Sequence, residues 1–147
     1  MDCPACSHAL TEIQVGSVKL DVCAGGCAGI WFDAFELQRV EKEHPGIGDA
    51  LVNVPRDPAL QVDFSFKRSC PRCDDIKLKR HFFSARKEVE VDQCPNCGGY
   101  WLDAGELEKI HAEKVRAAEE AHLADTNISM AAIRFLYRQR LQERPPL

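Results

Sequence analysis

The sequence predicts a small α+β protein in which two copies of one short unit are followed by C-terminal helices. Cysteines occur as two sets of four, and the phrase Trp-x-Asp-x-x-Glu-Leu occurs at residues 31–37 and again at residues 101–107. Polar and apolar residues alternate between the cysteine pairs of each set, which indicates strands. These observations predict two structural units of the same kind, each a β-hairpin followed by a helix.

The eight cysteines have the spacing of zinc ligands. Two close cysteine pairs separated by a hairpin-length interval are typical of four-cysteine zinc sites. Zinc takes four such ligands at tetrahedral corners, about 2.3 Å from each sulfur. The extra residue in the turn Ala24-Gly25-Gly26 is expected to be absorbed by its glycines. We therefore expect two Zn²⁺ ions per chain, one bound by Cys3, Cys6, Cys23 and Cys27 and the other by Cys70, Cys73, Cys94 and Cys97.

The segments between the cysteine pairs predict β-hairpins. Residues 10–23 alternate around Gly16-Ser17, and residues 76–94 alternate around Ser84-Ala85-Arg86. A hairpin brings the two cysteine turns of one set together without help from the other set. The predicted fold class is thus a small zinc-stabilised α+β protein with tandem zinc ribbons, each a β-hairpin plus a short capped helix, followed by C-terminal helices.

A helix start follows each second cysteine pair. Asp33 with Glu36, and Asp103 with Glu106, have the spacing of an N-cap and a reciprocal acidic partner. Four thiolates leave zinc no open position for water, so we expect these acids to cap helices and not to act as general bases. Trp31 and Trp101, which also recur in the two repeats, are expected to cover the zinc sites and their small cores, in preference to stacking on nucleic-acid bases.

The predicted domain organisation has four parts. The first zinc ribbon with its helix occupies residues 1–44, a Pro-rich linker residues 45–68, the second zinc ribbon residues 69–111 and a helical tail residues 112–147. No apolar stretch approaches the roughly 20 residues that a membrane-spanning helix needs.

The tail predicts two helices. The first runs from Ala104 to about Ala124, and Asp125-Thr126-Asn127 is expected to break it and to cap the second. The apolar face of the second helix could dock on the protein's own core, on a dimer mate, on another partner or on a membrane surface. Its members are Met130, Ile133, Leu136, Tyr137 and Leu141.

These motifs resemble a known family. Cys-Pro-x-Cys, a hairpin, and then Cys-Pro-x-Cys-x-Gly-x-Trp-Leu-Asp-x-Gly-Glu-Leu is similar to the transcription-factor-IIB-like zinc-finger family of small bacterial proteins. Residues 70–110 match closely, whereas residues 3–40 match with a wider second turn and with Phe35 where the pattern has glycine. The resemblance implies two tandem zinc ribbons and, through the family's name, a link to transcription or nucleic acid. Ribbons of this type serve many partners, so the fold does not fix the function.

Charge narrows the choice of partner. The formal net charge is −4, and two zinc ions with eight thiolates bring the loaded protein to about −8, which disfavours nonspecific nucleic-acid binding. Residues 67–87 nevertheless carry eight basic and two acidic side chains. We expect the bases of the second hairpin to contact an acidic partner. They are Lys77, Lys79, Arg80, Arg86 and Lys87.

The sequence therefore predicts a non-enzymatic binding or adaptor module in the cytoplasm, where thiols stay reduced and can bind metal. A protein partner or self-association is favoured over nucleic acid. If the protein binds nucleic acid, we expect a single strand whose bases stack on Phe82 and Phe83. Two alternatives use the same cysteines: a redox- or metal-responsive protein, and an iron-binding, rubredoxin-like electron carrier.

Overall fold

The computed structural model describes residues 1–43 and 54–142, and its internal contacts divide the chain into two units, Met1–His111 and Ala112–Leu147. The predicted linker at 45–68 therefore lies partly outside the described residues, as do the last residues of the predicted tail.

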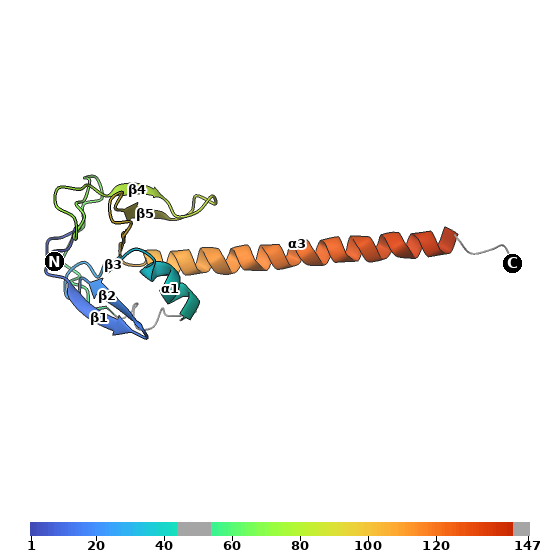
Figure 1. Ribbon diagram of the computed structural model, residues 1–147, viewed down its shortest axis with the longest axis horizontal. Coiled ribbons are helices and arrows are strands. Elements are labelled where there is room, and N and C mark those ends of the chain that lie inside the picture. Colours follow the sequence, from blue (N-terminus) through green and yellow to red (C-terminus); the bar gives the residue numbers. More distant parts are fainter. Residues whose placement is uncertain (44–53, 143–147) are drawn as a thin grey trace. The chain divides into compact units, whose positions relative to one another are not determined.

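One antiparallel sheet of six strands organises the first unit, in the order β1-β2-β3-β6-β5-β4 (Figure 1). The first three strands come from the first cysteine repeat and the last three from the second, so β3 and β6 meet at the centre. The two predicted ribbons are thus two halves of a single sheet. The strands are β1 Thr11–Val15, β2 Val18–Val22, β3 Ile30–Phe32, β4 Lys79–Phe82, β5 Glu90–Gln93 and β6 Tyr100–Leu102.

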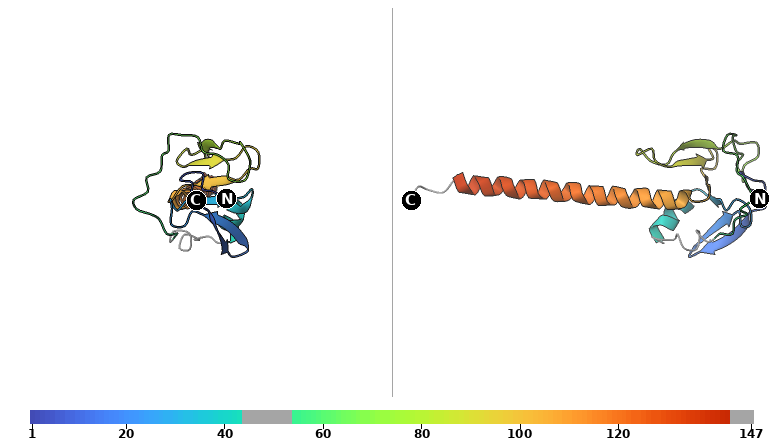
Figure 2. Two further views of the ribbon diagram at one scale, coloured as in Figure 1. Left: turned by 90° about the vertical axis from the view of Figure 1, so that its left-hand side faces the viewer. Right: turned by 180° about the vertical axis from the view of Figure 1, so that it is seen from behind.

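The two hairpins lie on opposite sides of the central pair of strands (Figure 2). The β1–β2 hairpin turns at Gly16-Ser17, as predicted, with Val15 opposite Val18. Gly16 has a φ of 59°, which glycine adopts without a steric penalty. The β4–β5 loop is longer than the sequence indicated, because strand pairing stops at Phe82 opposite Glu90. A bond from the Phe83 amide to the Val89 carbonyl, 2.8 Å long, extends the closure of this loop.

The apolar core of this unit joins residues from both repeats. The alternation of β2 places Val18, Leu20 and Val22 inside and Lys19 outside. The helix α1, Glu36–Glu43, and the first turns of α3, Glu106–Gln142, cover this core. Such a small core gives marginal stability without an added constraint. Its buried members are Val18, Leu20, Val22, Ile30, Phe32, Leu37, Val40, Val89, Val91, Leu102, Leu107 and Ile110.

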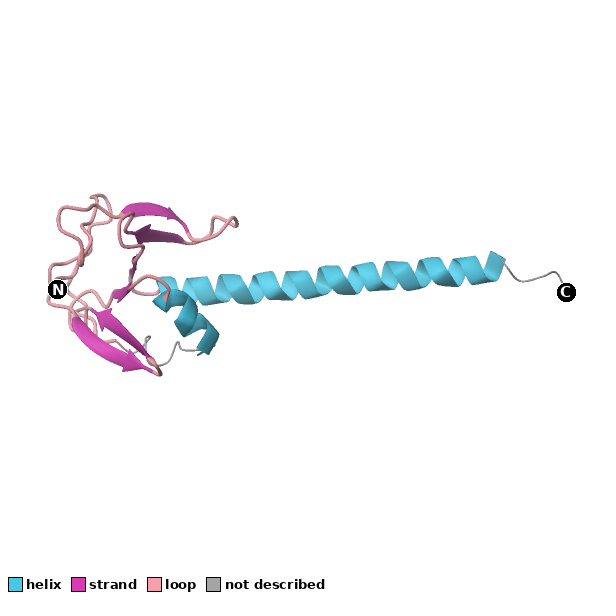
Figure 3. Ribbon diagram, viewed as in Figure 1, coloured by secondary structure: helices cyan, strands magenta, loops and turns pink. Residues whose placement is uncertain are grey.

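The helix α3 is continuous from Glu106 to Gln142, so the predicted break at residues 125–127 is wrong (Figure 3). The side chain of Thr126 is compatible with the helix, because its Oγ1 donates a 2.9 Å hydrogen bond to the His122 carbonyl one turn earlier. Asp and Asn inside a helix cost only about 0.7 kcal/mol relative to Ala. The strong helix preference of the neighbouring alanines therefore outweighs this small cost, and the helix continues.

Candidate metal centres

The first four-cysteine set forms a compact group of sulfur atoms. The Sγ atoms of Cys3 and Cys27 are 3.5 Å apart, and those of Cys6 and Cys23 are 3.4 Å apart. All four sulfurs lie within 4.8 Å of one another. A tetrahedron with Zn–S bonds of about 2.3 Å has sulfur separations of about 3.8 Å, so this group has the size of a zinc shell.

The second set has the same geometry. The Sγ atoms of Cys70 and Cys97 are 3.8 Å apart, and those of Cys73 and Cys94 are 3.9 Å apart. Polar groups of the two turns point at the sulfurs. The Cys73 amide donates to Cys70 Sγ at 3.4 Å, and Asn96 Nδ2 donates to Cys73 Sγ at 3.2 Å. Such donors favour the thiolate form that binds metal.

The widened turn of the first set depends on its two glycines, as the sequence predicted. Gly25 has a φ of 78°, and a Cβ on Gly26 would stand 2.5 Å from Cys23 Sγ. The extra length of this turn is tied to the segment before the second ribbon. The Gly25 amide donates to the Pro55 carbonyl at 2.7 Å, and the Asp57 amide donates to the Gly26 carbonyl at 2.9 Å.

The thiols of each set cannot all be ionised together without a cation. The hydrogen bond between Cys3 and Cys27 raises the pKa of Cys3 and lowers the pKa of Cys27 to about 5, so that the pair shares a proton. Burial raises the pKa of Cys23 to about 11 and that of Cys70 to about 12. A bound Zn²⁺ compensates the packed negative charge and displaces these protons.

The donor chemistry and the sulfur geometry thus fit one zinc ion in each set. These are the same eight cysteines in the same two sets that the sequence indicated. Across residues 1–43 and 54–142 they are the two groups of His, Cys, Asp or Glu side chains close enough to hold a metal ion. Four thiolates complete the coordination of zinc, so each site is of the structural type.

The two tryptophans cover the cysteine clusters, as predicted. Trp31 and Trp101 are fully buried in one cluster with cysteines of both sets, and they lie opposite each other in the β3–β6 pairing. Each indole also packs on a glycine of the other ribbon. An added Cβ would stand 2.2 Å from Trp101 Cζ2 at Gly29, and 2.2 Å from Trp31 Cζ2 at Gly99. The sequence analysis missed this exchange, although each glycine stands two residues before a tryptophan in its repeat.

Of the acidic residues at the helix starts, the glutamates make the expected capping contacts but the aspartate side chains do not. Glu36 Oε2 and Glu106 Oε2 each accept a 2.8 Å bond from the amide of the aspartate three residues earlier, as in a capping box. The aspartate side chains, however, accept bonds from tryptophan. Trp31 Nε1 donates to Asp33 at 2.9 Å, and Trp101 Nε1 donates to Asp103 at 3.2 Å.

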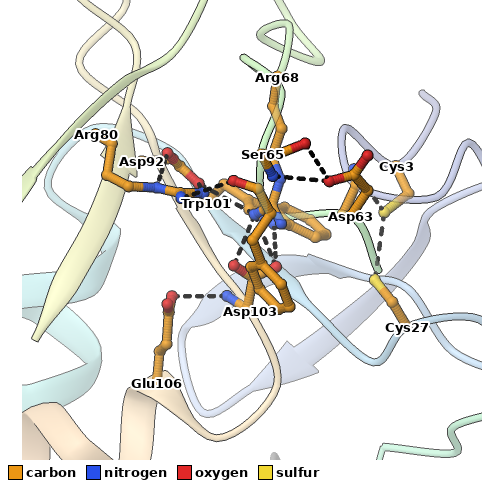
Figure 4. Close-up of polar contacts among 12 residues, drawn as sticks. Cys3, Cys27, Asp63, Ser65, Arg68, Arg80, Asp92, Trp101, Asp103 and Glu106 are labelled. Carbon is orange, nitrogen blue, oxygen red and sulfur yellow. Dashed lines mark hydrogen bonds and ion pairs between the residues drawn. The ribbon is translucent and has the colours of Figure 1, made fainter. Parts of the chain in front are cut away.

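Arg68 makes the shortest side-chain contact of Asp103, and the sequence analysis did not predict this contact. Its Nη1 donates to Asp103 Oδ2 at 2.6 Å and to Asp92 Oδ2 at 3.1 Å (Figure 4), and the residue as a whole is only 2% exposed. The ring of Phe64 lies against this guanidinium, 5.3 Å from its Cζ. Arg68 therefore fastens the segment before Cys70 to β5 and β6.

Arg72 makes the equivalent contact in the first ribbon. It bonds to Asp33 through Nε and to Asp21 through Nη2, the latter at 3.4 Å. Arg72 itself belongs to the cysteine turn of the second ribbon, between Cys70 and Cys73. The two zinc ribbons are therefore linked by one arginine, Arg72, as well as by both tryptophans.

The five predicted partner-binding bases do not all project freely into solvent, because three of them contact other groups of the protein. Arg80 donates to Asp92 at 3.2 Å and to the Phe64 carbonyl at 3.0 Å, and Arg86 lies 3.7 Å from Glu88. Lys77 Nζ donates to Ser69 Oγ at 2.8 Å. Lys79 and Lys87 have exposed side chains, on β4 and in the β4–β5 loop respectively. Two of these five charges are thus paired with acids within the protein, and the role of the five residues stays a prediction.

Membrane insertion finds no support in the helices: within residues 1–43 and 54–142, neither α1 nor α3 combines the length and the apolarity that crossing a bilayer requires.

Comparison with known proteins gives one match. The family model described as "Transcription factor zinc-finger" matches residues 2–43 and residues 69–113, which are the two cysteine repeats. No curated protein and no solved structure matched the chain. The two matched regions cover more than half of the chain and contain all eight cysteines. The chain therefore belongs to the transcription factor zinc-finger family, with two tandem zinc-binding ribbons.

Proposed function

We propose that this protein is a non-enzymatic adaptor that binds a macromolecule through the surface of its zinc-stabilised sheet. The observation that carries the proposal is the closure of both metal sites by four buried or half-buried thiols. A zinc ion with four thiolates has no position for water or substrate, so its contribution is to stability and shape.

The acidic residues near the metal sites support a structural role. Glu106 accepts a backbone amide, and Asp103 accepts bonds from Trp101 and Arg68. In the first ribbon, Glu36 and Asp33 are engaged in the same ways. Carboxylates held by such contacts serve the fold, and a general base would need one of them turned toward a substrate.

A protein partner is favoured over nucleic acid. Arg80 and Arg86 are paired with acids, and Phe83 packs partly against the core, which leaves Phe82 as the exposed aromatic of the second hairpin. Lysines without stacking partners suit an acidic protein surface better than single-stranded nucleic acid, which uses aromatic stacking. The description of the family suggests that such a partner belongs to the transcription apparatus.

Metal analysis with thiol counting, on protein purified without added metal, tests the structural role of the sites. Two zinc ions per chain and no freely reactive thiols are expected. Reactive thiols with less metal would instead support a redox or metal-responsive protein, because the sulfurs of Cys6 and Cys23 are close enough to be joined after small movements. Absorbance of iron–thiolate bonds would support an electron carrier.

Titration with two probes tests the binding surface. We would use labelled polyglutamate and labelled single-stranded RNA at several salt concentrations, with the pair Lys79→Glu and Lys87→Glu. A matched control reverses the charge of Lys19 and Lys42, which are exposed in the first ribbon. Loss of polyglutamate binding in the first pair alone supports the proposal. Binding of RNA in preference to polyglutamate contradicts it, as does an equal effect of the control pair.

A further inference from the structure

The second unit presents an apolar stripe on α3 that is independent of the zinc sites and of the proposed function. Its members are spaced by three, four, seven and eight residues, so they lie on one side of the helix. All of them are large and 43% to 64% exposed. The stripe, hereafter the α3 stripe, consists of Val115, Leu123, Met130, Ile133 and Tyr137.

Exposed apolar residues in this arrangement indicate a binding surface. Single exposed apolar side chains are ordinary, but several of them along one side of a helix mark a contact with another molecule. Long helices in proteins obtain most of their stability by packing such a face. Between Val115 and Tyr137 the helix rises about 33 Å at 1.5 Å per residue, which is long enough for a paired-helix contact.

The charges of α3 indicate what the stripe contacts. Residues 112–126 contain four acidic and two basic side chains, whereas residues 127–142 contain three arginines and no acid. One half of the helix is therefore negative and the other positive. A second copy of α3 in the opposite direction would bring unlike halves together, whereas a parallel copy would bring like halves together.

The sizes of the apolar residues favour the same arrangement. If two helices cross near Thr126 in opposite directions, Leu123 of each faces Met130 of the other, and Val115 faces Tyr137. The smallest side chain of the stripe, Val115, then opposes the largest, Tyr137, and Leu123 opposes Met130, which has a similar volume. Glu119, which interrupts the stripe, comes near Arg134 of the second copy, so the interruption is compatible with pairing.

We propose that α3 pairs antiparallel with α3 of a second copy of this chain, through the α3 stripe and centred near Thr126. A membrane surface is the weaker alternative, because the acidic half of the helix carries part of the same stripe and anionic lipids would repel it. The contact is electrostatically assisted and of modest area, so it is expected to be reversible and weakened by salt.

Analytical ultracentrifugation of the full zinc-loaded chain at increasing concentration tests this pairing. The mass should rise from 16.5 kDa toward twice that value, and the dissociation constant should increase at high salt. The double variant Met130→Asn, Ile133→Asn should weaken dimerisation at least tenfold while the protein keeps two zinc ions. The matched control is Phe135→Asn, which removes an equally exposed apolar side chain, at 59%, from the opposite side of the helix.

A spin label at Gln139→Cys tests the orientation. Antiparallel helices that cross near Thr126 place the two labels about 39 Å apart along the axis, whereas parallel helices in register place them about 10 Å apart. Protein without the introduced cysteine should take up no label, because its thiols are bound to zinc. The proposal is overturned if the chain stays monomeric at every concentration, whether or not the monomer binds anionic vesicles. It is also overturned if the two labels lie about 10 Å apart, or if Phe135→Asn weakens dimerisation as much as the double variant does.

Discussion

Trp101 lies so close to Gly29 that a Cβ added to this glycine would stand 2.2 Å from Cζ2 of the indole. The contact joins the two ribbons, because Trp101 belongs to β6 of the second ribbon and Gly29 precedes β3 of the first. Trp31 and Gly99 repeat it in the opposite direction. The side chains that cover the metal sites therefore also hold the two halves of the sheet together.

Gly29→Ala should destabilise the zinc-loaded protein by at least the roughly 1–3 kcal/mol that overpacking usually costs. The indole is fully buried and lacks room to retreat. Urea unfolding of the zinc-loaded protein measures the change. Gly105→Ala is the matched control, because its Cβ would meet open space and only its φ of 86° opposes the substitution. A smaller loss for Gly29→Ala than for this control would contradict the close packing.

Asp103→Ala should cost about 3–5 kcal/mol, because it leaves the buried guanidinium of Arg68 without its closest carboxylate. Loss of an ordinary helix cap would cost only about 1 kcal/mol. The internal repeat supplies the control: Asp33→Ala should cost less, since its partner Arg72 is 43% exposed. Both variants should retain two zinc ions. Equal losses of stability in Asp103→Ala and Asp33→Ala would show that burial of Arg68 does not determine the cost.

The double variant Asp103→Ala, Arg68→Met separates this effect from the loss of the tryptophan bond. Removing the buried charge together with its partner should restore part of the stability lost in Asp103→Ala. Denaturant unfolding of the single and double variants in one thermodynamic cycle measures the recovery. No recovery would assign the loss to the bond from Trp101 Nε1 instead.

The features that the sequence predicted well are local ones. Ligand spacing, the turn at Gly16-Ser17 and the position of Glu106 three residues after Asp103 depend on contacts within a few residues or within one hairpin. The joining of the ribbons does not, because β3 and β6 pair residues that are 68 to 72 positions apart in short strands without a distinctive pattern. The same holds for Arg68, which the sequence presents as one base among many in residues 67–87.

The continuity of α3 was missed for a different reason. Asp125-Thr126-Asn127 consists of residues that favour helix starts, and a sequence pattern cannot show that Thr126 will bond to the His122 carbonyl. The local preference against a helix is weak, and the flanking helical segments outweigh it.

Glu106 should make the protein less stable as pH rises toward neutrality. Burial, followed by the charge of Asp103, raises the pKa of Glu106 from 4.5 to about 7. Because the folded state holds the proton more tightly, its contribution is complete below pH 4.5 and is lost as pH rises through about 7. Glu106→Gln keeps an oxygen for the Asp103 amide and has no charge.

Denaturant unfolding of both proteins between pH 5.5 and 8 measures this effect. Zinc release affects both in the same way, so the difference between them reports Glu106. Glu106→Gln should gain stability relative to the unsubstituted protein as pH increases. A difference that stays constant across this range would mean that the carboxylate is already ionised in the folded protein.

Loss of the second zinc ion should weaken binding of the first. Trp101 and Arg72 belong to the second ribbon and contact Gly29 and Asp33 of the first, so collapse of the second site removes both supports. Cys73→Ser removes one ligand of the second set and leaves the first set complete. If the coupling has the usual 1–3 kcal/mol, the affinity of the first site for zinc should fall about 5- to 150-fold. Competition with a coloured chelator measures that affinity in the variant and in the unsubstituted protein. The reciprocal variant Cys6→Ser removes a ligand of the first set. It should weaken zinc binding at the second site by a similar factor, because coupling between two binding free energies is reciprocal. Two ribbons that were merely tethered would each keep their affinity when the other site is removed.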